Sequence, residues 1–200
     1  MTTLTNAIAD PAGNASLDDG ATPGDIVFAA EDIARAVDDI AARIRVDYGG
    51  EPLLLVGVLK GAAVFIADLM RSLGDYPLMV EFIVVASYGI GRPSDAGGNV
   101  RILKDLDRNP AGSHVLLVED IVDEGLTLEY LCNNLRSRGP KSLRACALVD
   151  KPFHRKTGVV VDYVGLRAPD AFLVGYGLDY QERFRNLPYI CKLQAPAERI

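Results

Sequence analysis

Apolar residues along this chain recur with helical spacing in some segments and form short unbroken runs in others. Ile33, Val37 and Ile40 share one face of a helix, whereas LLLVGVL at residues 53–59 is typical of a strand buried on both sides. The predicted helices cover residues 30–45, 62–73 and 127–138, and the predicted strands cover residues 53–59, 78–86, 115–118 and 143–149. Strand and helix therefore alternate through most of the chain.

This alternation predicts an α/β fold, with a parallel sheet that carries helices on both faces. Ligands of such sheets bind beyond the carboxyl ends of the strands. Three loops leave predicted strands at that edge, and they begin at Lys60, Glu119 and Asp150. We therefore expect the functional site at this edge of the sheet.

Two segments carry no periodic pattern. Residues 1–24 are rich in Ala, Asp, Gly, Thr and Asn, which predicts a disordered tail in front of a single domain at residues 25–200. Residues 88–99 (YGIGRPSDAGGN) hold four of the 19 glycines and a proline, which predicts a long mobile loop.

Composition narrows the class of partner. The formal net charge of -6 disfavours general binding to nucleic acid or to anionic membranes. Cys132, Cys146 and Cys191 form no Cys-x-x-Cys pair, which disfavours a zinc site or a disulfide framework. The chain has neither a secretory leader nor an apolar run near the roughly 20 residues of a membrane span. We therefore expect a cytoplasmic protein that acts on a small molecule.

The segment at residues 115–127 (VLLVEDIVDEGLT) carries the most chemistry. A predicted strand ends at Val118, two carboxylates follow at Glu119 and Asp120, and a turn with Gly125 leads into the helix. Backbone N–H groups of such a turn and the helix N-terminus bind anions, and glycine permits a phosphate to come close. Neighbouring carboxylates suit a ligand that also brings hydroxyl donors and a divalent cation. Phosphate, diol and metal together describe a phosphoribosyl group, although a lone Asp-x-Gly-x-Thr would equally suit helix capping.

The segment resembles the phosphoribosyl diphosphate signature of type I phosphoribosyltransferases. Residues 25–193 resemble one branch, the hypoxanthine-guanine phosphoribosyltransferases, through motifs in the family's order. These motifs are LKG at residues 59–61, SYG at 87–89, RILKDLD at 101–107, Lys151-Pro152, and GYGLDYQERFRNLPY at 175–189. The resemblance implies the type I fold, in which the N- and C-terminal segments form a small hood.

The resemblance also implies a reaction, in which a 6-oxopurine displaces pyrophosphate from phosphoribosyl diphosphate with the help of Mg²⁺. The implied roles are as follows: Glu119 and Asp120 for the ribose hydroxyls; Asp123, Glu124, Gly125, Leu126 and Thr127 for the 5-phosphate; Asp123 also as general base; Leu59, Lys60, Gly61 and Arg185 for pyrophosphate; Ser87 and Tyr88 for a flexible lid; Ile121, Lys151, Phe172 and Leu173 for the purine; and Asp179, with Glu119 and Asp120, for the metal. The family also carries a non-proline cis peptide at the position of Leu59-Lys60, and it forms homodimers or homotetramers.

Several alternatives stay open. An ammonium is donor-only, so Lys151 favours a 6-oxo group over the amine of adenine, but it does not separate hypoxanthine and guanine from xanthine. Lys151 could also be a surface lysine, Lys60-Gly61 an ordinary turn, and Phe172 a core residue. A regulator of the same fold that senses phosphoribosyl diphosphate is a further possibility, against which the retained Asp123 and Arg185 argue.

The chain departs from the family pattern at two positions. Glu124 replaces a small residue, commonly Thr or Ser, and its charge should repel a phosphate unless the side chain points outward. Asp150 stands where a basic or neutral residue is common, and it could pair with Lys151 or with another cation. His154, in the locally basic stretch 153–158, is expected to be a solvated loop residue.

Overall fold

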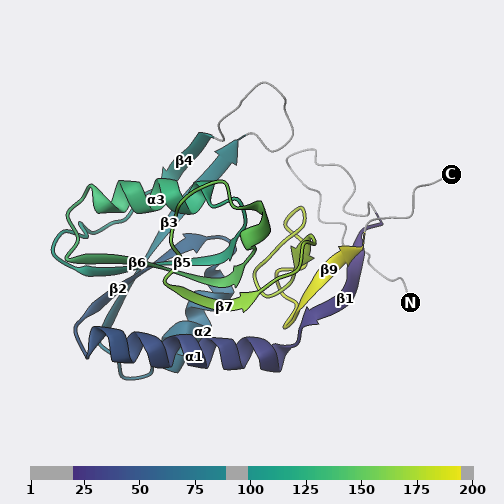
Figure 1. The fold of residues 1–200 in the computed structure, drawn as a ribbon, viewed down its shortest axis with the longest axis horizontal. Helices are drawn as coiled ribbons and strands as arrows, with labels where there is room; N and C mark the ends of the chain where they lie inside the picture. The colour runs from purple at the N-terminus through teal and green to yellow at the C-terminus, as the bar shows by residue number, and fades with distance from the viewer. Residues whose placement is uncertain (1–19, 89–98, 195–200) are drawn as a thin grey trace, which may run out of the picture.

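The computed structural model describes residues 20–88 and 99–194 of the 200-residue chain. Its main element is a six-stranded sheet with the order β4-β3-β2-β5-β6-β7 (Figure 1). Five strands are parallel, and β4 (Asn99–Lys104) runs antiparallel to β3 (Leu78–Tyr88). The α/β fold with a parallel sheet is thus confirmed. Within the described residues, no helix is both long and apolar enough to cross a membrane.

The centre of the sheet consists of β2 (Leu53–Leu59), β5 (His114–Val122) and β6 (Ser142–Asp150). Most of their side chains are buried, as the unbroken apolar runs predict. The observed β5 is longer than the predicted strand 115–118, because its pairing with β6 continues to Val122. Glu119 and Asp120 therefore lie within the strand and not after it, which corrects the prediction.

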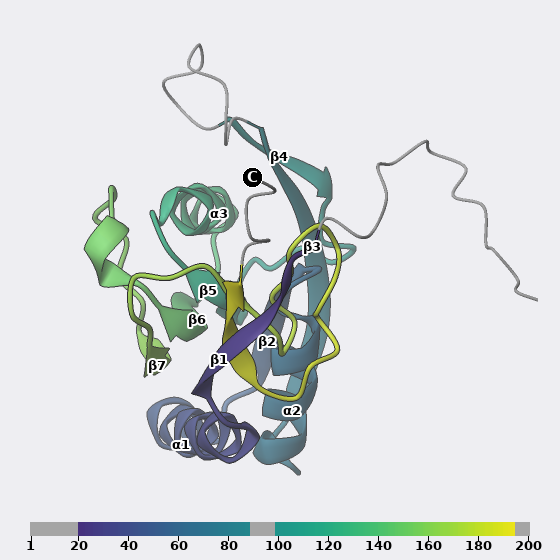
Figure 2. The same cartoon turned by 90° about the vertical axis from the view of Figure 1, so that its right-hand side faces the viewer.

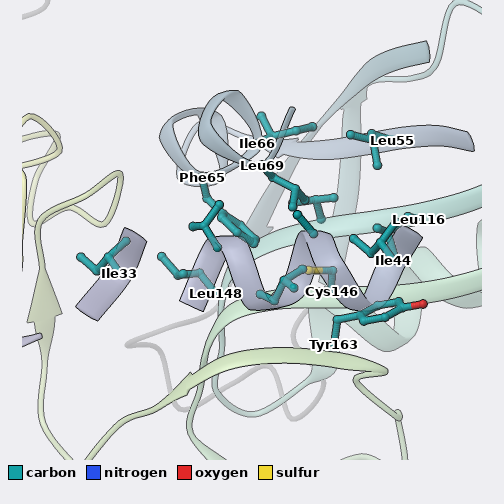
Figure 3. Packing of buried hydrophobic residues seen from close by; sticks show 14 of the residues in the cluster. Ile33, Ile44, Leu55, Phe65, Ile66, Leu69, Leu116, Cys146, Leu148 and Tyr163 are labelled. Atoms are coloured by element: carbon teal, nitrogen blue, oxygen red, sulfur yellow. The ribbon is translucent and has the colours of Figure 1, made fainter. Parts of the chain in front are cut away.

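Helices cover both faces of the sheet. α1 (Ala30–Tyr48) and α2 (Ala63–Leu73) lie on one face, and α3 (Leu126–Arg136) lies on the other (Figures 1 and 2). The larger apolar cluster joins the first two helices to the sheet, and Figure 3 shows Ile33 of α1 and Phe65 of α2 within it. A second cluster holds α3 against the opposite face through Leu128, Leu131 and Leu135.

Two strands of the main sheet, β4 and β7, were not predicted from the sequence. β4 pairs with β3 up to Tyr88↔Asn99, so both ends of the predicted mobile loop belong to strands. The loop itself, residues 89–98, lies outside the described residues. β7 (Tyr163–Arg167) completes the other edge of the sheet, within a region predicted only as short apolar runs.

A second, three-stranded sheet forms the predicted hood beside the main sheet (Figure 1). β1 (Thr22–Phe28) and β8 (Leu173–Val174) both pair antiparallel with β9 (Ile190–Gln194). Residues 22–24, assigned to the tail by their sequence, therefore belong to β1, because their backbone pairs with β9. Residues 1–19 of that predicted tail lie outside the described residues.

Candidate active site

The carboxyl ends of β2, β5 and β6 meet at one edge of the sheet, because the three strands are parallel neighbours. β2 ends at Leu59, β5 at Val122 and β6 at Asp150. The last residues of these strands and the segments that follow them contain most of the site residues predicted from the sequence. Two further groups come from the hood side of the molecule, at residues 172–173 and 179–185.

The last residues of β5 carry two adjacent carboxylates. The side chain of Glu119 is buried, and burial, followed by the charge of Asp120, raises its pKa well above the usual range. Burial raises the pKa of Asp120 to about 6, although its Oδ1 accepts a hydrogen bond of 2.7 Å from the Ile121 N–H. The strand thus holds two carboxylates in a place that disfavours their charge while no cation or hydroxyl donor is bound.

Residues 123–127 form the turn between β5 and α3. Gly125 caps the helix with a φ of 84°, a conformation that favours glycine. A Cβ on Gly125 would lie 2.5 Å from the Thr157 hydroxyl oxygen and 2.7 Å from Cδ of Arg155. The helix begins at Leu126, one residue earlier than predicted, so the backbone N–H groups of Leu126 and Thr127 lie in its first turn. The glycine turn and the helix N-terminus from which anion binding was predicted are therefore both present.

Asp123 and Lys151 form an ion pair that joins the ends of β5 and β6. Lys151 Nζ donates to Asp123 Oδ2 at 2.9 Å. Lys151 is only 7% exposed, so it is not a surface lysine. The second oxygen of Asp123, Oδ1, is buried and has no hydrogen-bond partner within the described residues. The pair therefore presents one buried cationic donor and one free acceptor side by side.

The turn after β2 contains the cis peptide expected between Leu59 and Lys60. Gly61 packs directly against Asp120, since a Cβ there would lie 1.7 Å from Asp120 Oδ2. On its other side, Gly61 contacts the hood, because a Cβ on Gly177 would lie 2.2 Å from its carbonyl oxygen. The turn is thus held between β5 and the segment that carries Asp179 and Arg185.

Arg185 organises that segment. It donates from Nη1 to the Gly177 carbonyl at 2.7 Å and pairs through Nη2 with Asp179 Oδ1 at 2.7 Å. Both Arg185 and Asp179 lie close enough to Asp120 to shift its pKa, Arg185 downward and Asp179 upward. Glu182 links Lys60 at 3.1 Å to Arg185 at 3.4 Å. Lys60, Gly61, Asp120, Asp179 and Arg185 are therefore brought together.

The residues predicted to bind a purine lie on three elements. Phe172 is 57% exposed, which contradicts a purely core role, and its ring meets Tyr180 edge-to-face at 5.9 Å. Leu173 is buried in β8, and Ile121 is half-buried near the end of β5. The positions predicted for the lid, Ser87 and Tyr88, are the last two residues of β3.

Both departures from the family pattern are ion-paired. Glu124 Oε1 lies 2.5 Å from Lys156 Nζ, so its charge is already matched by a cation. Asp150 pairs with Arg155 and not with Lys151, which selects the second of the two alternatives. His154, expected to be solvated, is exposed and lies 2.7 Å from Asp170 Oδ1.

Sequence reasoning missed Arg155, Thr157 and Glu182. Arg155 donates from Nε to the Asp123 carbonyl at 3.1 Å, and Thr157 packs against Gly125. The signal available in the sequence was the basic stretch 153–158, but its contact with residues 122–125 depends on strand pairing. Glu182 had no sequence signal for its contact with Lys60, because the two residues lie 122 positions apart.

The chain was compared with known proteins. The model of the phosphoribosyl transferase domain family matches residues 24–181. A hypoxanthine-guanine phosphoribosyltransferase of Bacillus subtilis is 46% identical over 165 residues, covering 82% of this chain and 90% of that protein. One of Mycobacterium tuberculosis is 48% identical over 177 residues, covering 84% of this chain and 86% of that protein.

Solved structures agree. The chain is similar to a hypoxanthine-guanine phosphoribosyltransferase of Bacillus anthracis, with a TM-score of 0.80 at 38% identity, covering 87% of this chain and 99% of the other. It is also similar to a hypoxanthine phosphoribosyltransferase of Trypanosoma cruzi, with a TM-score of 0.81 at 42% identity, covering 86% of this chain and 92% of the other. The fold resemblance therefore extends over nearly all the described residues.

Proposed function

Because this chain belongs to the phosphoribosyl transferase domain family, and within it to the hypoxanthine-guanine phosphoribosyltransferases, we propose that it is a purine salvage enzyme. It transfers the 5-phosphoribosyl group of phosphoribosyl diphosphate to hypoxanthine or guanine, and the products are IMP or GMP and pyrophosphate.

The pair formed by Asp123 and Lys151 carries this proposal. In a 6-oxopurine, the 6-oxo oxygen and N7 are neighbouring groups on one edge of the ring. The buried Lys151 ammonium, which donates to Asp123 Oδ2 at 2.9 Å, suits the 6-oxo oxygen as a second donor target, and Asp123 Oδ1, which has no partner within the described residues, suits an N7 proton. An adenine would place an amine donor against the ammonium, so the pair favours 6-oxopurines.

The chemical step follows from these positions. N9 of the purine attacks C1′ of the ribose, the bond from C1′ to pyrophosphate breaks, and the proton on N7 passes to Asp123. Phe172, exposed and braced by Tyr180, stacks on the purine, while Ile121 and Leu173 line the base site. The bound base is thereby held in line with C1′.

The rest of phosphoribosyl diphosphate lies along the same edge. The N–H groups and the Thr127 hydroxyl of residues 123–127 hold the 5-phosphate, and Glu119 and Asp120 accept from the ribose hydroxyls. Leu59, Lys60, Gly61 and Arg185 hold the pyrophosphate. Ser87 and Tyr88, at the end of β3, begin a lid that excludes water from the activated ribose.

The donor set suits Mg²⁺. The cation takes oxygen ligands and usually combines one or two carboxylates with substrate phosphates and water, so it needs no full protein cage. Within the described residues no group of three potential metal ligands occurs, but Asp179 lies close enough to Asp120 to raise its pKa. Asp179, Asp120 and Glu119 would hold the cation together with the substrate, and the cation would neutralise charge on the pyrophosphate.

The assembly and location of the protein belong to the same proposal. We expect a homodimer or homotetramer in the cytoplasm, which light scattering of the purified chain and cell fractionation would test. In the similar Trypanosoma cruzi protein, the C-terminal region has a role in the oligomeric state and the enzymatic activity.

One assay tests the activity. The purified full chain is given Mg²⁺, phosphoribosyl diphosphate and, in turn, hypoxanthine, guanine, xanthine or adenine, and nucleotide is quantified by chromatography. We expect product with hypoxanthine and guanine and none with adenine. No product with any purine would overturn the proposal, and binding of phosphoribosyl diphosphate without turnover would identify a sensor of this metabolite instead. Turnover with adenine alone would overturn the role of Lys151.

A further inference from the structure

Residues 151–157, which we call the clasp, run alongside the turn that is proposed to hold the 5-phosphate. Three successive carbonyl groups of that turn accept hydrogen bonds from the clasp. The bonds run from Lys151 N to Val122 O at 2.9 Å, from Arg155 Nε to Asp123 O at 3.1 Å, and from Lys156 N to Glu124 O at 2.9 Å. The backbone of the turn is therefore held by the clasp, which belongs to the connection between β6 and β7.

These bonds determine where the N–H groups of the turn point. In a trans peptide the C=O and N–H bonds lie in one plane and point in opposite directions, and no cis peptide occurs among residues 122–125. Since the carbonyls of residues 122–124 face the clasp, the N–H groups of residues 123–125 face away from it. They join the unpaired N–H groups at the start of α3 on the ligand side.

Arg155 supplies the one side-chain bond in this set. Its guanidinium also pairs with Asp150 at the end of β6, and the two side chains are only 17% and 12% exposed. Its Cδ packs against Gly125, where no larger residue would fit. Arg155 thus ties the middle of the turn to the rigid edge of the sheet.

The pairing also indicates what Arg155 does not do. Its charge is matched by Asp150, and its Nε is occupied by the carbonyl of Asp123. A guanidinium held in this way acts on the backbone of the turn and not on the phosphate itself. The same geometry accounts for Asp150, which departs from the family pattern.

Given the proposed function, on which this inference rests, we propose that Arg155, held by Asp150, is a positioning residue for the 5-phosphate. It keeps the turn at residues 123–127 in the conformation that binds phosphoribosyl diphosphate. The turn binds the 5-phosphate equally in the substrate and in the transition state. Loss of the Arg155 contact therefore raises the KM for phosphoribosyl diphosphate and leaves kcat nearly unchanged.

The test compares Arg155→Gln, Arg155→Lys and Asp150→Asn with the wild-type full chain. For Arg155→Gln we expect the KM for phosphoribosyl diphosphate to rise about tenfold, with the KM for hypoxanthine and kcat within about twofold. Arg155→Lys restores part of the loss, because it keeps the charge but lacks the planar fork. The double variant Arg155→Gln/Asp150→Asn loses less than the product of the single losses, because the two residues act as one unit. Arg35→Gln, which removes an exposed Arg–Asp pair on α1, serves as the matched control.

An unchanged KM for phosphoribosyl diphosphate in a folded Arg155→Gln protein would overturn the proposal. A fall in kcat alone, or an equal rise in both KM values with a lower melting temperature, would overturn it as well. A wild-type protein that makes no nucleotide would instead contradict the proposed function. In that case calorimetry with ribose 5-phosphate would still decide the role of Arg155, with weaker binding to Arg155→Gln supporting it and equal binding refuting it.

Discussion

The two parts of the site that are proposed to bind phosphate groups are built differently. The 5-phosphate part, residues 123–127 with the clasp, is held by backbone hydrogen bonds and the buried pair Asp150–Arg155. The pyrophosphate part contains Lys60 and Arg185, which both pair with Glu182. The side chains of Lys60 and Glu182 are 67% and 63% exposed. The 5-phosphate part has its shape before a ligand binds. In the pyrophosphate part, the cationic side chains must exchange their carboxylate partners for the ligand.

This difference suits the two ends of the substrate. The 5-phosphate remains on the nucleotide, so a preformed backbone site holds the same group before and after reaction. Pyrophosphate must leave, and exposed ion pairs contribute only about 0–1 kcal/mol each. Their re-formation would therefore aid release without obstructing binding strongly. The predictions below test whether the two parts differ in this way.

The largest effect is expected for Gly61→Ala. Gly61 is tightly packed within the pyrophosphate part, since the new Cβ would lie 1.7 Å from Asp120 Oδ2. The backbone must shift by more than an ångström, and a misplacement of that size costs about 100-fold in rate. We expect kcat/KM to fall by at least about that factor in steady-state assays. Gly158→Ala is the control, because its Cβ would meet nothing within 4 Å. Near-normal activity of Gly61→Ala would show that this turn adapts as freely as the charges around it.

A somewhat smaller effect is expected for Asp123→Asn, in the preformed part. The amide keeps an oxygen for Lys151 but cannot take the purine proton, so kcat should fall about 100-fold, the lower end for general base catalysis. Circular dichroism should show an unchanged fold. Asp105→Asn, which removes the partner of Arg138 on the surface, is the matched control. Wild-type turnover of the Asp123 variant would remove that residue from the mechanism.

The sequence predicted the preformed part better than the exchangeable one, for a physical reason. Val115 to Val118 and the turn at Gly125 carry local signals, namely apolar runs and the glycine and hydroxyl residues of an anion-binding turn. The pair Lys60–Glu182 joins positions 122 residues apart, and the bond from Arg155 to the Asp123 carbonyl joins positions 32 residues apart, so no local pattern encodes either contact. β5 was predicted too short because its last residues include two carboxylates, which mask a strand whose length is set by pairing with β6.

A moderate effect of opposite sign is expected for Glu182→Gln. Glu182 accepts from Lys60 at 3.1 Å, and this hydrogen bond keeps the pKa of Glu182 below its usual range. Without this carboxylate, Lys60 is free for pyrophosphate before the substrate binds, while Arg185 keeps its pairing with Asp179. We expect the KM for phosphoribosyl diphosphate, and the inhibition constant of pyrophosphate, to fall about two- to fivefold. A rise in both constants would mean that Glu182 positions the two cations and does not compete for them.

The smallest effect is expected for Glu124→Gln, which is the counterpart of Glu182→Gln in the preformed part. Glu124 also pairs with a lysine, Lys156 at 2.5 Å, but this lysine has no proposed ligand to bind. The carbonyl of Glu124 accepts from the Lys156 N–H at 2.9 Å, and this bond survives the substitution. The turn should therefore keep its shape, and the KM for phosphoribosyl diphosphate should stay within about twofold of the wild type, since the exposed pair contributes little. If the KM fell tenfold, the carboxylate would have to face the phosphate, and the 5-phosphate part would be limited by side-chain charge in the same way as the pyrophosphate part.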